Sequence, residues 1–175
     1  MKWLLSFLVF TLAAAPGVTG RQASSQPQAA DDSSPMPALT LHDFKGRLVP
    51  PERYKGKILV VDFWATWCTP CIAEVPRLNR LEEKYSSKGV KVIGVTMASG
   101  AAKEVRPYID QFNIKYTVLM GDDNQAYDLN IYGFPTTYVV TRDGKIFRKI
   151  VGIIPGKTEQ LESDLEKLLF PARPK

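Results

Sequence analysis

Residues 61–71, VDFWATWCTPC, decide the fold of this chain. The first half of this stretch belongs to an apolar, β-branched run over residues 58–64, which is interrupted only by Asp62. Such a run is typical of a strand that is covered on both faces, as in a parallel or mixed sheet. The second half holds Cys68 and Cys71, which are the only cysteines of the chain. The stretch therefore predicts a buried strand that passes into a helix at a Cys-x-x-Cys pair.

The chain beyond this stretch alternates between helical and strand patterns. Apolar residues recur at helical spacing after Cys71, and Gly89 suits the end of that helix. The dipeptide Asp143-Gly144 lies between two β-rich runs and predicts a hairpin. The further helices are expected over residues 104–112, 124–129 and 158–169, and the strands over 58–64, 90–97, 117–120, 136–140 and 146–151.

The residues before the long strand predict a small extension of the sheet. Residues 39–41 and 47–49 are short β-rich runs on either side of a turn at 43–46, which is the pattern of a β-hairpin. The order of all elements predicts an α/β fold. We expect a central mixed β-sheet flanked by helices on both of its faces, with an N-terminal β-hairpin extension.

The amino terminus has the pattern of a secretory signal peptide. A positively charged start precedes an uncharged apolar core over residues 3–15, and these 13 residues are too few for a spanning helix of about 20. We expect export to the periplasm or another extracytoplasmic space; an uncleaved segment that tethers the protein to the membrane is the alternative. The predicted organisation is a signal peptide (1–20), a flexible linker (21–37), one folded domain (38–170) and a tail (171–175).

Composition narrows the range of functions. Of the 175 residues, 45% are apolar and 23% charged, which fits a single globular domain. The formal charge of +5 is spread along the chain, so nucleic acid is not an expected partner. Two cysteines and one histidine, His42, cannot supply the four ligands of a structural zinc site. We expect no metal, no cofactor other than a redox-active Cys68–Cys71 disulfide, and a monomeric protein.

A Cys-x-x-Cys pair at a strand–helix junction predicts redox chemistry. Cys68 falls at the helix amino terminus, where free backbone N–H groups and the helix dipole favour an anion. Its pKa should therefore lie below the free-thiol value of about 8.5. Cys71, one turn later, is placed to attack a mixed disulfide formed by Cys68. Pro70 is tolerated between them because a first-turn residue needs no intrahelical N–H bond.

Other uses of two such cysteines fit less well. Attached haem requires a histidine directly after the second cysteine, where Ile72 stands. A purely structural disulfide closing so small a ring would constrain little of the unfolded chain. Dithiol–disulfide exchange remains as the favoured interpretation.

The same segment, residues 61–71, resembles the active site of the thioredoxin superfamily and is most similar to TlpA-like extracytoplasmic thiol–disulfide oxidoreductases. Residues 55–57 (KGK) and 132–137 (YGFPTT) are further marks of that family. The resemblance extends from about residue 38 to residue 169. It implies a thioredoxin-like fold and an enzyme that exchanges thiols and disulfides.

The resemblance also implies roles for individual residues. Cys68 matches the attacking thiol and Cys71 the resolving thiol. Pro135 matches a cis-proline that faces the disulfide and helps to hold an extended substrate segment, and cis bonds are essentially confined to proline. Trp67 matches the aromatic residue that shields the site, and Pro76 a proline that kinks the active-site helix. The supporting positions are Trp67, Pro70, Glu74, Phe134 and Thr136.

Two acidic residues are candidates for a part in the reaction. Asp62 lies inside an apolar strand, where burial should raise its pKa, and it matches a buried aspartate that relays a proton to the resolving cysteine. A structural hydrogen bond is the alternative role. The neighbouring strand, residues 90–97, offers only Lys91 at its start and no interior lysine to pair with Asp62. Glu74 is either an acid of the site or an ordinary exposed helix residue.

The partners are expected to be proteins with thiols or disulfides. Thr69-Pro70 lacks the histidine that many oxidants of the superfamily hold between the cysteines, so we expect a potential toward the reducing end of about −120 to −270 mV. The substrate would be an exported protein, with cytochrome c maturation as one pathway served. A reductase in an oxidising compartment must be recharged, and the resemblance implies a membrane-bound electron donor.

Two alternatives stay open. A peroxiredoxin-like peroxidase would need Pro and Thr where Val61 and Ala65 stand before Cys68. A non-catalytic binding module on a thioredoxin fold would need no turnover of the disulfide. The presence of both cysteines with Asp62 and Pro135 argues against that module.

Overall fold

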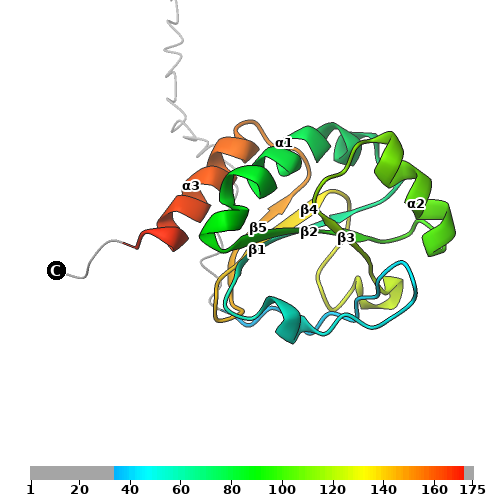
Figure 1. Cartoon of the computed structure of the whole chain (residues 1–175), viewed down its shortest axis with the longest axis horizontal. Coiled ribbons are helices and arrows are strands. Elements are labelled where there is room, and N and C mark those ends of the chain that lie inside the picture. Colours follow the sequence, from blue (N-terminus) through cyan, green and yellow to red (C-terminus); the bar gives the residue numbers. More distant parts are fainter. Residues whose placement is uncertain (1–33, 172–175) are drawn as a thin grey trace, which may run out of the picture.

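The computed structural model describes residues 34–171 and contains one five-stranded sheet with the spatial order β3-β2-β1-β4-β5 (Figure 1). Strand β1 lies at the centre, parallel to β2 and antiparallel to β4. Strand β3 runs parallel to β2, and β5 antiparallel to β4, so the sheet is mixed as predicted. The strands are β1 (Ile58–Trp64), β2 (Val90–Thr96), β3 (Thr117–Met120), β4 (Thr136–Val140) and β5 (Ile146–Val151).

Three α-helices accompany the sheet: α1 (Thr69–Tyr85), α2 (Ala102–Gln111) and α3 (Lys157–Leu169). Pro76 lies inside α1 without ending it. The helix expected over residues 124–129 is instead the short 3-10 helix η3 (Asp123–Gln125), followed by turn residues. The side chain of Asp122 accepts a hydrogen bond from Asn124 N, and such local bonds favour turns over helices. Two further 3-10 helices are η1 (Pro51–Tyr54) and η2 (Ser86–Lys88).

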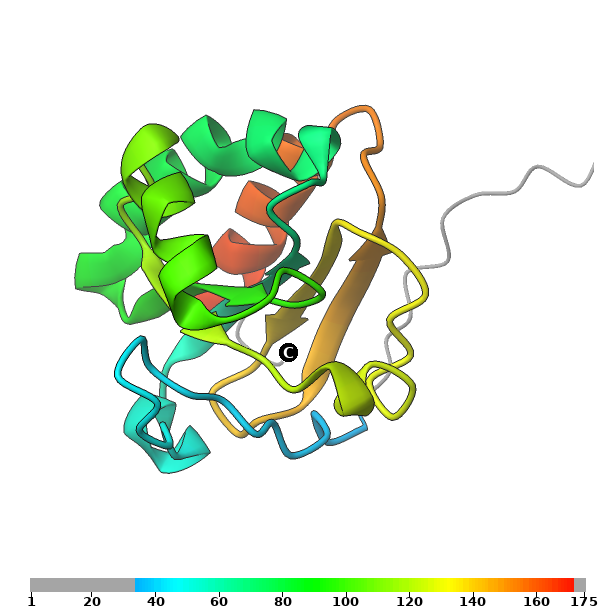
Figure 2. The ribbon, with the colours of Figure 1, turned by 90° about the vertical axis from the view of Figure 1, so that its right-hand side faces the viewer.

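The α-helices pack against one face of the sheet only. Buried residues of α1, α2 and α3 form one cluster with β1 side chains such as Val60 and Trp64. A second cluster on the opposite face includes Val61 and Phe63, and it is closed by the N-terminal segment and the chain around residues 121–134 (Figures 1 and 2). The expectation of helices on both faces is therefore wrong for the α-helices, because loops and the 3-10 helices η1 and η3 cover the second face.

The N-terminal hairpin is present as a pair of bridged segments rather than as long strands. Val49 N donates to Leu41 O at 2.8 Å, and His42 bridges both Leu48 and Met120 of β3. Leu41 and Val49 are buried against the second face of the sheet. The hairpin thus covers the edge of β3 as well as part of the core.

Ordered contacts begin before residue 38. Met36 N donates to Gly144 O at 2.9 Å and Ile146 N donates to Ser34 O at 2.9 Å, so part of the predicted linker pairs with the turn between β4 and β5. The predicted signal peptide and residues 21–33 of the linker lie outside the described residues, as do residues 172–175 of the tail. Within residues 34–171, no helix has the length and apolar character needed to cross a membrane.

Candidate active site

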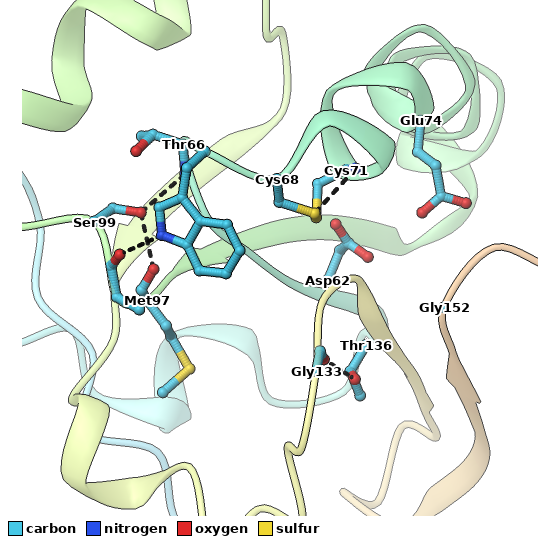
Figure 3. The surroundings of a disulfide bond; sticks show 12 residues. Asp62, Thr66, Cys68, Cys71, Glu74, Met97, Ser99, Gly133, Thr136 and Gly152 are labelled. Carbon is cyan, nitrogen blue, oxygen red and sulfur yellow. Dashed lines mark hydrogen bonds between the residues drawn. A yellow bond between two sulfur atoms is a disulfide. The ribbon is translucent and has the colours of Figure 1, made fainter.

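The two cysteines lie where β1 gives way to α1. Strand β1 ends at Trp64, and a turn closed by Cys68 N donating to Ala65 O at 3.1 Å leads into the helix. Cys68 is the N-cap of α1 and forms a disulfide with Cys71, with an S–S distance of 2.03 Å and a Cα–Cα distance of 5.3 Å (Figure 3). The protein is therefore described in its oxidised form.

The helix terminus is directed at the sulfur of Cys68. Cys71 N donates to Cys68 Sγ at 3.3 Å, which is a backbone N–H from the first turn of α1. Such N–H groups have no partner inside a helix and stabilise negative charge at its amino terminus. After reduction, the same arrangement favours Cys68 as a thiolate, which is the nucleophilic form of a cysteine.

Aromatic side chains form the exposed rim beside the disulfide. Trp67 is 65% exposed, and its Nε1 donates to Ala98 O at 2.7 Å. Its ring lies 5.8 Å from that of Phe134 in an edge-on arrangement. Thr66 N donates to Ser99 Oγ at 2.9 Å and fixes the same loop (Figure 3). The structure thus brings the Cys68 loop and the Phe134 loop together, as the family resemblance implies.

Pro135 lies at the start of β4 with a cis bond to Phe134, as expected. Thr136 Oγ1 donates to Gly133 O at 2.7 Å (Figure 3), and Gly152 N donates to Pro135 O at 2.7 Å. These bonds hold the turn before β4 from both sides. Thr136 is fully buried and contributes to the support of this turn rather than to its surface.

Asp62 is buried at the centre of the sheet beneath the disulfide. It is 1% exposed, and its carboxyl group points toward the underside of α1 between Cys71 and Glu74 (Figure 3). Thr137 Oγ1 of β4 donates to Asp62 Oδ1 at 2.6 Å. Burial raises the pKa of Asp62 to about 7, against the opposing effects of Lys157 and the Thr137 bond, while the charge of Glu74 adds to the increase. A carboxyl group that titrates near neutral pH is suited to proton exchange with a thiol.

Glu74 is part of the buried interior and not an exposed helix residue. It is 3% exposed, and its Oε2 accepts a hydrogen bond from Lys157 Nζ at 2.7 Å. Lys157 is 2% exposed and is the first residue of α3. This burial contradicts the interpretation of Glu74 as an ordinary exposed helix residue. Lys91, the only lysine of β2, pairs elsewhere with Glu82.

The sequence did not lead to Lys157, because only the neighbouring strand, residues 90–97, was considered as the source of a cation for Asp62. One signal was available. A lysine in the first turn of a helix lies at the positive end of the helix dipole, where acidic residues are favoured. Lys157 directly follows Gly156 at the start of the last amphipathic helix, and this placement is unfavourable for an exposed side chain.

A family model described as Redoxin matches residues 31–169, which is most of the chain. The chain belongs to the Redoxin family. The thioredoxin-like protein YneN of Bacillus subtilis is 29% identical over 94% of this chain and 98% of its own length. The thiol-disulfide oxidoreductase ResA of Bacillus cereus is 32% identical over 75% of each chain. A thiol:disulfide interchange protein from Bacteroides sp. has a similar structure, with a TM-score of 0.70, 26% identity and coverage of 83% of this chain and 95% of its own.

These likenesses agree with the geometry of the site. The Redoxin-family chain has a thioredoxin-like fold of the TlpA-like type, and the Cys68–Cys71 pair makes it a thiol–disulfide oxidoreductase. Within the described residues 34–171, no group of three or more His, Cys, Asp or Glu is arranged to hold a metal ion.

Proposed function

We propose that this protein reduces disulfide bonds of exported proteins in an extracytoplasmic space. The observation that carries the proposal is Cys68 at the N-cap of α1, bonded to Cys71 and facing the N–H groups of the first helical turn. This arrangement favours the thiolate on one sulfur and keeps the second thiol within bonding distance. No cofactor other than the disulfide is needed, since the dithiol carries two electrons.

The reaction has two exchange steps. The Cys68 thiolate attacks one sulfur of a substrate disulfide, forms a mixed disulfide and releases the other substrate sulfur as a thiolate, which takes a proton. Cys71 then loses its proton and attacks Cys68 Sγ, which releases the second substrate thiol and forms the Cys68–Cys71 disulfide. The substrate has gained two electrons and two protons, and a dithiol electron donor at the membrane must return two electrons to the protein.

Asp62 is proposed as the group that receives the proton of Cys71. Its carboxyl group points toward Cys71 from below, and its raised pKa of about 7 lets it accept and release a proton near neutral pH (Figure 3). Asp62 is 1% exposed, so bulk water has little access to its carboxyl group. The proton can return to Cys71 when the Cys68–Cys71 disulfide is reduced again and Cys71 leaves as a thiolate.

The direction and the compartment are part of the proposal. Thr69-Pro70 provides no histidine to stabilise the Cys68 thiolate further, which favours a reductase over a strong oxidant. The predicted signal peptide supports a location outside the cytoplasm, where structural disulfides persist. Apocytochrome c, with its Cys-x-x-Cys-His segment, is one substrate class that such a reductase would serve.

Reduction of insulin with a dithiol donor tests the proposal. Wild-type protein should accelerate the precipitation of the insulin chains, and Cys68→Ser should not exceed the rate of the donor alone. A wild-type rate equal to that of Cys68→Ser would contradict the proposal and favour a non-catalytic binding module. Consumption of hydrogen peroxide at a faster rate than insulin reduction would favour the peroxidase.

A further inference from the structure

Three buried charged side chains come from three elements on the face of the sheet that carries the disulfide. Asp62 comes from β1, Glu74 from α1 and Lys157 from α3, and each is at most 3% exposed. The Glu74–Lys157 pair is joined at 2.7 Å, and Lys157 Nζ also lies 3.4 Å from Gly152 O. The charges of both partners act on Asp62. No residue of this trio other than Asp62 has a part in the two exchange steps described above.

We propose that Lys157 is a positioning residue of the exchange reaction, held by Glu74 as the buried cation that keeps Asp62 ready to receive the proton of Cys71. The proposal rests on the function proposed above and adds a residue to its site. It assigns Glu74 the task of fixing Lys157 at this place.

The structure of β2 explains why the cation comes from α3. Gly94 is the neighbour of Asp62 on β2. A Cβ atom at Gly94 would lie 2.9 Å from the Tyr116 ring and 3.1 Å from Trp64 Nε1, so β2 has no room for a side chain at this point. A lysine therefore does not fit at the β2 position next to Asp62. The first residue of α3, which packs over the same face, supplies the charge instead.

Stability alone does not account for the Glu74–Lys157 pair. Removal of two charges from water is costly, and a well-packed apolar pair is often as stable as a buried ion pair. Lys157 also lies in the first turn of α3, where the helix dipole disfavours a cation. A second ion pair of α3, in which Asp164 binds Arg148 of β5, lacks this conflict, because Asp164 lies two turns further along the helix.

The other groups that face Asp62 carry no competing charge. Thr137 on β4 donates a neutral hydrogen bond, and Gly94 on β2 has no side chain. Burial and the charges of Asp62 and Glu74 raise the pKa of Tyr116, before β3, well above its ordinary value, so this phenol stays neutral. Cys71 is bonded to Cys68 in the oxidised protein. Glu74 and Lys157 are therefore the two charges that set the balance around Asp62.

This arrangement predicts shifts of opposite sign from the two members of the pair. Loss of the cation in Lys157→Met leaves two facing carboxylates, which makes ionisation of Asp62 harder. Loss of the anion in Glu74→Gln leaves the cation alone with Asp62, which makes ionisation easier. A charge within a few ångströms changes a carboxyl pKa by about one unit or more. The double variant, Glu74→Gln with Lys157→Met, removes both charges.

The test follows the ionisation of the Asp62 carboxyl group in the oxidised protein by NMR, together with the pH dependence of insulin reduction. We expect the Asp62 midpoint to rise by about one pH unit in Lys157→Met, to fall by about one unit in Glu74→Gln and to stay near the wild-type value in the double variant. The pH profile of the activity should move in the same directions. Arg148→Met is the matched control, since it breaks the ion pair that joins β5 to Asp164 of α3, and it should leave both readouts unchanged.

Shifts of the same sign in the two single variants, or midpoints that do not move in folded protein, would overturn the proposal. An equal shift in Arg148→Met would assign the effect to the packing of α3. If Lys157→Met fails to fold, Glu74→Gln can be compared with the double variant, because the two differ only at Lys157. Their Asp62 midpoints should differ by about one pH unit. Failure of the proposed function has a separate signature, because wild-type insulin reduction would then match Cys68→Ser while the Asp62 titration still reports on Lys157.

Discussion

The two faces of the sheet differ in what they bury. The face under the α-helices holds the disulfide and all four buried charged residues of residues 34–171, namely Asp62, Glu74, Lys157 and Asp164. The opposite face, covered by the N-terminal segment and loops, buries a cluster of apolar residues around Phe63 and Ile93. Adjacent β1 residues take the two roles, since alternate side chains point to opposite faces. We call the face under the α-helices the chemical face and the opposite face the structural face.

The largest effect should come from the resolving thiol on the chemical face. In Cys71→Ser, the mixed disulfide at Cys68 has no neighbouring thiol to release it, so turnover of insulin should fall to the background rate and covalent adducts should accumulate. Mass spectrometry of protein incubated with a cell-envelope extract would identify the adducts and, with them, the substrate. Cys68→Ser should form none; adducts of equal yield on Cys68→Ser would reverse the assigned roles.

The next effect concerns stability and its dependence on pH. The folded protein holds the Asp62 proton up to about pH 7, whereas an unfolded aspartate releases it near 3.8. The protonated Asp62 carboxyl group therefore makes its full contribution to the free energy of unfolding below about pH 4. This contribution is lost as the pH rises to about 7. Asp62→Asn does not titrate, so its stability relative to wild type should rise by about 4 kcal/mol across this interval.

Denaturant unfolding of the oxidised proteins at pH 4 and pH 8 measures this difference. A constant difference between Asp62→Asn and wild type at the two pH values would show that Asp62 is ionised throughout. Phe63→Leu, the adjacent residue on the structural face, is the control, and its cost should not change with pH.

A smaller effect is expected on the rate. Asp62→Asn removes the proposed acceptor of the Cys71 proton, and loss of general acid–base assistance should slow the resolution of the mixed disulfide by about 100-fold at pH 7. Stopped-flow measurement of the reduced protein with a model disulfide separates the two steps. The attack by Cys68 should be nearly unchanged, and an equal slowing of both steps would argue for a structural role of Asp62.

The smallest effect comes from the structural face. Ile93→Val removes one methylene group from the apolar cluster and should cost about 1 kcal/mol of the free energy of unfolding. Its insulin reduction and the pH profile should match wild type. A shifted pH profile in this variant would show that the structural face influences the chemistry on the opposite face.

Much of the fold follows from sequence patterns because the strands are strongly apolar. The predicted bounds of β1 and β4 agree with the structure, and β2 ends one residue earlier than expected. The side on which the helices pack was not predictable, because periodicity shows that a strand is buried but not what covers it. Loops such as the one after β3 have no periodic pattern, so the sequence does not indicate that they cover a core.

The residues of the site also differ in how well the sequence predicts them. Cys68, Cys71 and Pro135 lie in short motifs, and the structure shows the Cys68–Cys71 disulfide and the cis bond before Pro135. Contacts between elements far apart in the chain have no such local signal. Glu74 and Lys157 are 83 residues apart, and their pairing depends on how α3 packs across α1.

Alkylation of the reduced protein with iodoacetamide tests most directly the claim that the helix terminus activates one sulfur. The account predicts that Cys68 reacts first, with a pKa below the ordinary thiol value of about 8.5, while Cys71 reacts only after unfolding. Mass spectrometry at a series of pH values would assign each site. Equal reactivity of Cys68 and Cys71, with ordinary pKa values for both, would contradict the account.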